Sequence, residues 1–226
     1  MEINSDFSKR VIVHAGKQEW VPSPMKGVDR RMLDRIGDEV ARATSIVRYA
    51  PKSNFSAHTH TGGEEFFVLD GVFQDEHGDF PAGTYVRNPP TSSHTPGSEA
   101  GCTIFVKLWQ FDMNDRHQMR VDTLSADWQA DPDRQGVEHL PLYSDDREDV
   151  SMETWHPGQT VALDAANGME VLVIGGSFTE GNESFEIQSW LRLPVGASST
   201  AIAGPDGCKV WIKRNHLKET PTAPSS

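Results

Sequence analysis

The second half of this 226-residue chain repeats the first half, and this repeat strongly constrains the possible fold. Three pairs of segments align in the same order: EFFVLDGVF (65–73) with EVLVIGGSF (170–178), YVRNP (85–89) with WLRLP (190–194), and GCTIFVK (101–107) with GCKVWIK (207–213). The first two pairs share one offset, and the third pair differs from it by a single residue. A chance match would not stay in order over nearly the whole chain. The sequence therefore predicts two copies of one structural unit.

The repeated unit reads as β-structure. Its extended runs are rich in β-branched and aromatic residues, and Gly, Pro, Asn or Asp bracket them, as in VIVH, TSIVRYA, EEFFVLDGVF, GTYVRN and CTIFVKLWQF. No helical period extends beyond about three turns, apart from a weak one at 115–124. We expect an all-β protein with one unit in residues 1–115 and the second in residues 116–226.

The charge and cysteine content exclude several classes of protein. A formal net charge of −12 repels nucleic-acid phosphates. No run approaches the roughly 20 apolar residues that a membrane helix needs. The N-terminal MEINSDFSKR lacks the apolar core of a signal peptide, and the two cysteines do not suggest a disulfide-built fold. These features predict a cytoplasmic protein that binds neither nucleic acid nor membrane.

One stretch carries residues that suit a metal ion. It begins HTHTGGEEFFVLDG, and it ends at His94 in PPTSSH. Side chains alternate along a strand, so His58 and His60 point to the same face. Two glycines then let the backbone turn before Glu64 adds a carboxylate. Imidazole and carboxylate together suit Zn, Fe, Mn, Ni or Cu.

The repeat provides an internal control for this metal site. In the second copy, His58 and His60 fall near residues 163–166, Glu64 falls on Met169, and His94 falls on Ser199. The Gly, Phe, Arg, Pro and Lys residues of the framework persist, whereas the candidate ligands do not. Residues needed only for folding should occur in both copies, so the residues present in one copy alone are candidates for chemistry.

The spacing His-x-His-x3-Glu-x6-Gly, followed by a Gly-x5-Pro-x-Thr-x2-His segment at 83–94, resembles the two cupin motifs. Cupins are jelly-roll barrels that hold one metal inside the barrel mouth. The resemblance implies two tandem barrels, a metal-binding barrel at 1–115 and a degenerate barrel without ligands at 116–226. It implies His58, His60, Glu64 and His94 as the ligands of one divalent metal.

The full pattern HTHTGGEEFFVLDGVFQDEHGDFPAGTYVRNPPTSSHTP looks like the cupin-like domain of the ChrR anti-sigma factors, over about residues 20–112 and more weakly over 128–216. This resemblance implies a sensory or regulatory module that binds zinc and responds to a small molecule or an oxidant. The zinc module through which ChrR proteins grip a sigma factor carries a Cys-x2-Cys, and this chain has none. A sigma-factor partner therefore stays open.

The alternative function is that of a cupin dioxygenase, which would use Fe(II), Mn or Ni to cleave a small diketone-like or phenolic substrate. The sequence leaves sensor and enzyme open, and it shows no obvious general acid or base beyond the ligands and Glu65. Pairing of two chains through an outer sheet edge is also compatible with a jelly roll.

The other polar residues in the repeat have structural interpretations. Glu65 and Arg87 persist as Glu170 and Arg192, which favours buried structural roles and, for Arg87, a salt bridge. The cysteines stand at equivalent strand starts and are predicted to be buried thiols. The remaining histidines, which have no partner at ligand spacing, are expected to face solvent: His14, His77, His117, His139, His156 and His216.

Overall fold

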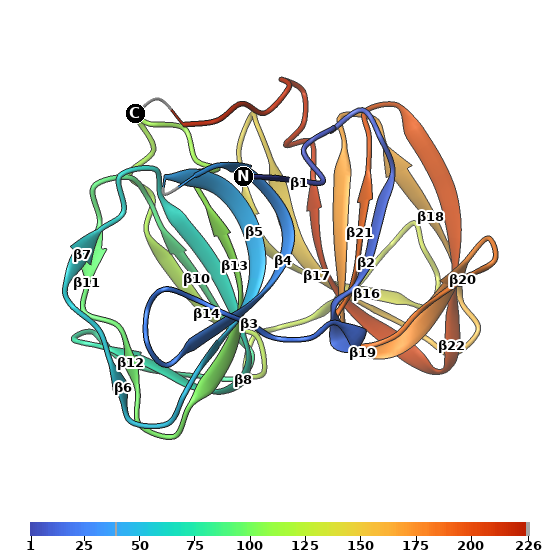
Figure 1. The fold of residues 1–226 in the computed structure, drawn as a ribbon. Helices are drawn as coiled ribbons and strands as arrows, with labels where there is room; N and C mark the ends of the chain where they lie inside the picture. Colours follow the sequence, from blue (N-terminus) through green and yellow to red (C-terminus); the bar gives the residue numbers. More distant parts are fainter. Residues whose placement is uncertain (39, 225–226) are drawn as a thin grey trace. The chain divides into compact units, whose positions relative to one another are not determined.

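The computed structural model describes residues 1–38 and 40–224, and nearly all regular structure in these residues is β-strand (Figure 1). One short 3-10 helix, η1 (Ala15–Lys17), is present in the described part of the chain. No helix in these residues is long and apolar enough to cross a membrane. Residues 1–5 and 19–125, with the C-terminal end from Thr222, form the first compact unit. Residues 6–18 and 126–221 form the second.

The first unit has a long twisted sheet in the order β1-β4-β5-β13-β8-β10-β14, with short strands at its ends. Its strands are β1 (Glu2–Ile3), β3 (Val21–Pro22), β4 (Val28–Gly37), β5 (Ala41–Tyr49), β6 (Ser53–Asn54), β7 (His58–Thr59), β8 (Glu64–Asp75), β9 (Gly78–Pro81), β10 (Thr84–Asn88), β11 (Ser93–His94), β12 (Gly97–Ser98), β13 (Cys102–Leu108) and β14 (Met119–Asp122).

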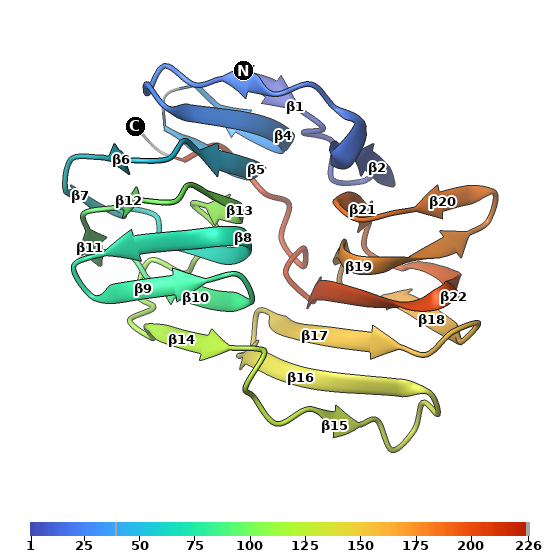
Figure 2. The same cartoon turned by 90° about the horizontal axis from the view of Figure 1, so that it is seen from below.

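The second unit has a sheet in the order β15-β16-β17-β22-β19-β21-β2 (Figure 2). Its strands are β2 (Val11–His14), β15 (Gln129–Ala130), β16 (Val137–Ser144), β17 (Asp149–Trp155), β18 (Thr160–Ala165), β19 (Met169–Glu180), β20 (Glu183–Phe185), β21 (Ser189–Leu193) and β22 (Ala197–Arg214). The path β4-β5-β13-β8-β10 of the first unit reappears here as β16-β17-β22-β19-β21. The predicted all-β fold with two repeated barrels is confirmed.

The last strand in each sheet shows that the units are not the contiguous halves 1–115 and 116–226 that the sequence suggests. In the first sheet, β14 pairs with β10, and Val121 lies opposite Tyr85. In the second sheet, the strand at this place is β2, and Val13 lies opposite Trp190. Each of these strands precedes one repeat in the sequence but completes the sheet of the other repeat.

A buried arginine in each sheet anchors this last strand. Arg87 on β10 lies over the Phe111 ring, 4.2 Å from its centroid, and donates to Asp115 at 2.5 Å. Arg192 on β21 lies 3.9 Å over the Phe7 ring. The salt bridge predicted for Arg87 is therefore present, and the repeated arginine has the same structural role in both units.

The interior of the second barrel is filled with apolar side chains. Along β18, Val161, Leu163 and Ala165 are buried while the residues between them are exposed. These side chains pack with Met169 and other buried residues in one core cluster. Each fully buried large aliphatic side chain contributes about 2 kcal/mol of transfer free energy. The interior at this end is therefore occupied by hydrophobic core.

The structure confirms the expectation for the two cysteines and contradicts the one for His216. Both cysteines are buried free thiols, as predicted, and burial raises the pKa of Cys102 to about 11 and that of Cys208 to about 12. The solvent-facing interpretation of His216 is wrong. Its side chain is 5% exposed, and its Nε2 lies 2.8 Å from the buried Glu170 carboxylate. The His216 ring is buried because it pairs with Glu170, which lies far away in the sequence and which a local pattern does not reveal.

Candidate metal centre

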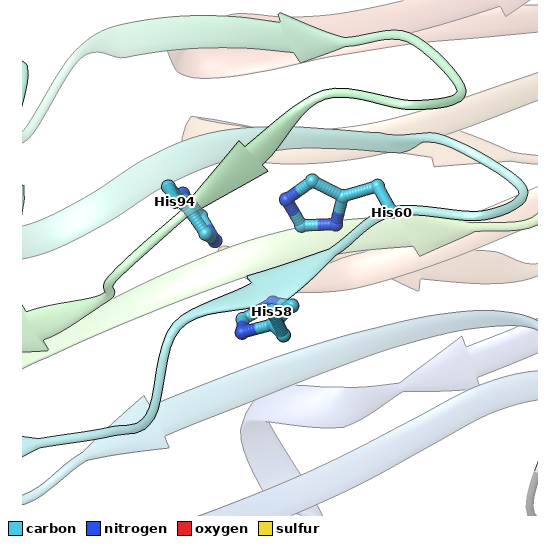
Figure 3. A group of neighbouring side chains, drawn as sticks. All are labelled: His58, His60 and His94. Carbon is cyan, nitrogen blue, oxygen red and sulfur yellow. The ribbon is translucent and has the colours of Figure 1, made fainter.

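The three histidines of the predicted site lie together at one end of the first barrel. Strand β7 carries His58 and pairs with β11, which places His58 directly opposite His94. His60 follows β7 and is fixed by two backbone hydrogen bonds, from its N–H to Ser92 and from Thr91 to its carbonyl. Figure 3 shows the three rings around one common space. Their centroids are 4.6 to 4.9 Å apart.

The ligand atoms of these histidines are close enough to hold one ion. One ring nitrogen from each of the three side chains lies within 4.8 Å of the others. Glu64, the first residue of β8, brings its Oε2 to 3.5 Å from His60 Nε2 and 3.7 Å from His94 Nε2. The structure thus brings together all four side chains that the sequence predicted as ligands.

The hydrogen-bonding state of the rings fits a metal. His60 Nε2 is buried and has no hydrogen-bond partner among the described residues. His58 Nδ1 lies 3.3 Å from the Ser56 carbonyl, and His94 Nδ1 lies 3.3 Å from Asp75 Oδ2. Those contacts leave the Nε2 atoms of His58 and His94 for another partner. A buried polar atom without a partner costs about 1–3 kcal/mol, and a cation in this space would remove that cost.

The buried position favours neutral imidazoles. Burial, with a smaller effect from His58, lowers the pKa of His60 to about 4. Burial also lowers the pKa of His94, although Glu64 opposes this shift. Burial raises the pKa of Glu64, and the nearby histidines partly offset the rise. These shifts favour the unprotonated rings of His60 and His94 at neutral pH, which is the form that binds metal ions.

The two glycines before Glu64 serve different purposes. Gly63 has φ +78°, so it makes the turn expected from the sequence. A Cβ on Gly62 would lie only 2.0 Å from the Trp109 ring, so this position needs a glycine for space. Trp109 N–H also donates to the Gly63 carbonyl at 3.2 Å. Trp109 therefore closes over the loop that joins His60 to Glu64.

Two further residues support the ligands, and the sequence did not single them out. Asp75, the last residue of β8, faces His94, and Asn88 Nδ2 lies 3.4 Å from Glu64 Oε2. A sequence signal did exist for Asp75, because its counterpart in the second repeat is Glu180, another acidic residue. Asn88 has an apolar counterpart, Leu193, so the repeat gives no signal for a role in the site.

The second barrel has no equivalent ligand set in its described residues. Leu163 and Ser199 are cross-strand partners there, as His58 and His94 are in the first barrel. Met169 begins β19 where Glu64 begins β8. Hydrophobic packing thus occupies the place of the candidate metal site.

Comparison with known proteins finds one family model that matches the first part of the chain. Residues 8–112 match the model of the ChrR cupin-like domain. Comparison with functionally curated proteins found no significant sequence match.

Solved structures share the fold over most of their length at low sequence identity. A candidate dioxygenase from Nostoc punctiforme superposes with a TM-score of 0.75 at 14% identity, covering 97% of this chain and 87% of its own. A candidate glyoxylate-induced protein from Pseudomonas aeruginosa gives 0.72 at 11% identity, covering 100% and 93%. A variant of oxalate decarboxylase from Bacillus subtilis gives 0.62 at 10% identity, covering 90% and 76%. Residues 8–112 are therefore similar to the ChrR cupin-like domain, and the chain as a whole shares its fold with these solved structures.

Proposed function

We propose that the first barrel binds one divalent metal through His58, His60, Glu64 and His94 and uses it to oxidise a small enolisable substrate with dioxygen. The observation that carries this proposal is the convergence of three imidazoles in which one buried nitrogen, His60 Nε2, lacks a hydrogen bond to another described residue. Three imidazoles and one carboxylate suit Fe(II), Mn(II) or Ni(II) as well as zinc.

The position of the site suits catalysis. His60 and His94 are buried, whereas His58 is exposed. A metal held here would be reached from the side of His58, while the barrel wall shields it on the other side. When bound, a divalent metal of this kind supplies Lewis-acid activation of an enolate and a binding position for dioxygen.

The barrel wall next to the site is apolar and aromatic. Phe73 lies 5.6 Å from the His94 ring and 5.9 Å from the Tyr49 ring, and Tyr49 lies 5.1 Å from Phe55. Tyr49 and Phe55 are only partly buried, although they pack against the core cluster of this barrel. This wall favours a substrate with a compact apolar body.

Tyr49 supplies a polar group to this wall. Its hydroxyl makes no hydrogen bond to another described residue, and burial followed by the charge of Glu64 raises its pKa. The phenol therefore stays protonated and can donate to an oxygen of the substrate. A diketone-like or phenolic compound, which binds as a monoanion, matches one metal and one such donor.

Charge on the wall also bears on substrate choice. Two charged side chains, Glu64 and Asp75, lie 3.7 and 3.3 Å from the His94 ring nitrogens, and both are acidic. When one carboxylate of a dicarboxylate binds the metal, the other would add negative charge beside these acidic groups. The wall thus favours a monoanionic substrate over a dianionic one.

A sensory function is the second candidate, and the match of residues 8–112 to the ChrR cupin-like domain favours it. In that case the same four ligands would bind zinc. A small molecule or an oxidant would then alter the metal site without undergoing a catalysed reaction. A sigma factor or another regulatory partner would then respond to this change in the metal site.

Metal analysis followed by oxygen uptake separates the two candidates. The protein, purified without a histidine tag, is expected to hold about one metal per chain, and the iron form should consume oxygen with a β-diketone but not with a dicarboxylate. Zinc occupancy together with no oxygen uptake by the iron, manganese and nickel forms would favour the sensory function instead.

The ligand assignment has its own test. His94→Ala is expected to remove the metal, whereas the exposed His156→Ala in the second unit should retain about one metal per chain. If His94→Ala also retains one metal per chain, the four-ligand assignment is wrong.

A further inference from the structure

We propose that Asp75 is a positioning residue of the metal centre, which holds His94 in the tautomer and orientation needed for binding. This inference rests on the proposed metal site. The carboxylate stands at the end of β8, where the β8–β9 hairpin begins. It is not one of the four predicted ligands.

The geometry around His94 places a different partner at each ring nitrogen. Asp75 Oδ2 lies 3.3 Å from Nδ1, and Glu64 Oε2 lies 3.7 Å from Nε2. The side chains of Asp75 and His94 are only 4% and 3% exposed. Water therefore has little access to the Nδ1 side of the ring, and Asp75 is the partner available to it.

A neutral imidazole carries one proton, which can sit on either nitrogen. With the proton on Nδ1, the ring donates to Asp75, and the Nε2 lone pair points toward His60 and Glu64. With the proton on Nε2, the ring cannot bind a metal there. The negative charge of Asp75 favours the first tautomer and makes the ring a stronger ligand.

The Asp75 carboxylate is itself held in place. Its Oδ1 accepts a hydrogen bond from the backbone N–H of His77 at 2.7 Å. One oxygen thus fixes the side chain in the hairpin turn, and the other faces His94. The two oxygens have separable tasks, which a suitable substitution can distinguish.

The second repeat shows what happens to this carboxylate when the histidine is absent. Glu180 stands at the end of β19, as Asp75 does at the end of β8, and Ser199 replaces His94. There the carboxylate accepts a hydrogen bond from Ser199 and forms an ion pair with Arg10. An acidic group is thus present in both barrels, and in each it faces the group that stands at the position of His94.

The test compares Asp75→Asn with Asp79→Asn on the same hairpin. The amide oxygen introduced by Asp75→Asn can still accept the His77 N–H bond, but the charge is lost, so the folded structure should be kept. We expect Asp75→Asn to weaken Mn(II) or Zn(II) binding by about 10- to 100-fold in a chelator competition. Asp79 accepts a hydrogen bond from Gln74 on the exposed side of the hairpin. Asp79→Asn should therefore leave the metal affinity unchanged.

A carboxylate-restoring variant and a spectroscopic measurement exclude a merely structural role. Asp75→Glu keeps a carboxylate and introduces the residue type found at this position in the second repeat. It should bind the metal ion more tightly than Asp75→Asn does. In the metal-free wild type, nitrogen NMR of His94 should show the proton on Nδ1, and this measurement needs no variant.

Two results would overturn the inference: a dissociation constant for Asp75→Asn within about twofold of wild type, or an Nε2-protonated His94 in the metal-free protein. If the wild-type protein binds no metal at all, the proposed function fails instead. The tautomer measurement distinguishes the two failures, since it does not depend on metal binding.

Discussion

At the residue scale, the candidate site depends on side chains other than the four candidate ligands. Gly62 leaves room for the Trp109 ring, and Trp109 itself has φ +57°, which is uncommon for a bulky residue. The ring lies against the loop between His60 and Glu64. Because two candidate ligands flank this loop, a displaced Trp109 would move them relative to each other.

Gly62→Ala should therefore cost about 1–3 kcal/mol of unfolding free energy, because the new methyl group and the ring cannot occupy the same space. In a Trp109→Ala background the same substitution should cost much less, and a double-mutant cycle by urea unfolding measures the difference. Gly175→Ala is the control, since its Cβ would meet only Lys209 Cβ at 3.7 Å. Equal costs of Gly62→Ala in both backgrounds would show that the ring is not the obstacle.

The sequence predicted the four candidate ligands but not their supports. His58, His60 and Glu64 follow one another within a short segment, so alternation and a turn place them together. Asp75 reaches His94 only because β8 and β9 form a hairpin whose end lies beside β11. Such a contact depends on the register of several strands, which a local pattern does not encode.

At the element scale, β17 is tied to its neighbours by one buried carboxylate. Glu153 is 1% exposed and accepts hydrogen bonds from both terminal nitrogens of Arg134, at 3.1 and 2.9 Å. Arg214 on β22 and the Trp155 indole also donate to it, at 2.8 and 2.7 Å. Burial alone would raise the pKa of Glu153, but Arg214 and then Arg134 outweigh burial and lower it.

Glu153→Gln should lower the unfolding free energy at pH 7 by about 1–3 kcal/mol, because it removes the buried negative charge that accepts hydrogen bonds from the partly buried Arg134 and Arg214. The folded pKa lies below the unfolded value of about 4.3, so the carboxylate stabilises the fold above that pH. Its contribution is lost as the pH falls through the folded pKa. Urea unfolding should show the difference from wild type shrinking toward pH 3.

Glu138→Gln on the exposed face of β16 is the control for this measurement. Its effect should be small at pH 7 and should change little with pH. A difference between wild type and Glu153→Gln that stays constant from pH 7 to pH 3 would contradict the assignment of the charge network to Glu153.

Most of the long strands could be predicted, whereas two features could not: β14, which forms in the segment with the weak helical period, and the exchange of β2 and β14. The β-branched residues of VIVH predict a strand at this position. Which sheet receives the strand depends on chain paths and on contacts such as Phe7 with Arg192, and these exist only in the folded protein. For this reason the predicted division at residue 115 differs from the two compact units.

At the scale of the whole molecule, each barrel needs residues from outside its own repeat. A chain that begins at residue 19 lacks β2, so β21 should become an open edge with unprotected backbone groups. Hydrogen exchange followed by mass spectrometry should show faster exchange at Ser189–Leu193, while Thr84–Asn88 keeps its protection from β14. Unchanged protection of Ser189–Leu193 would mean that β2 contributes little to the second sheet.

The pairing of β2 with β21 also bears on how the protein is made. A ribosome releases Val11–His14 before any other strand of the second unit, yet the partner strand Ser189–Leu193 begins 175 residues after His14. The first strand of that sheet therefore has no partner until those residues have been made. Closing so long a loop is slow, and until it happens an unpaired β21 edge is available to other chains. Newly made molecules should pass through a brief period in which the first sheet is complete and the second is not.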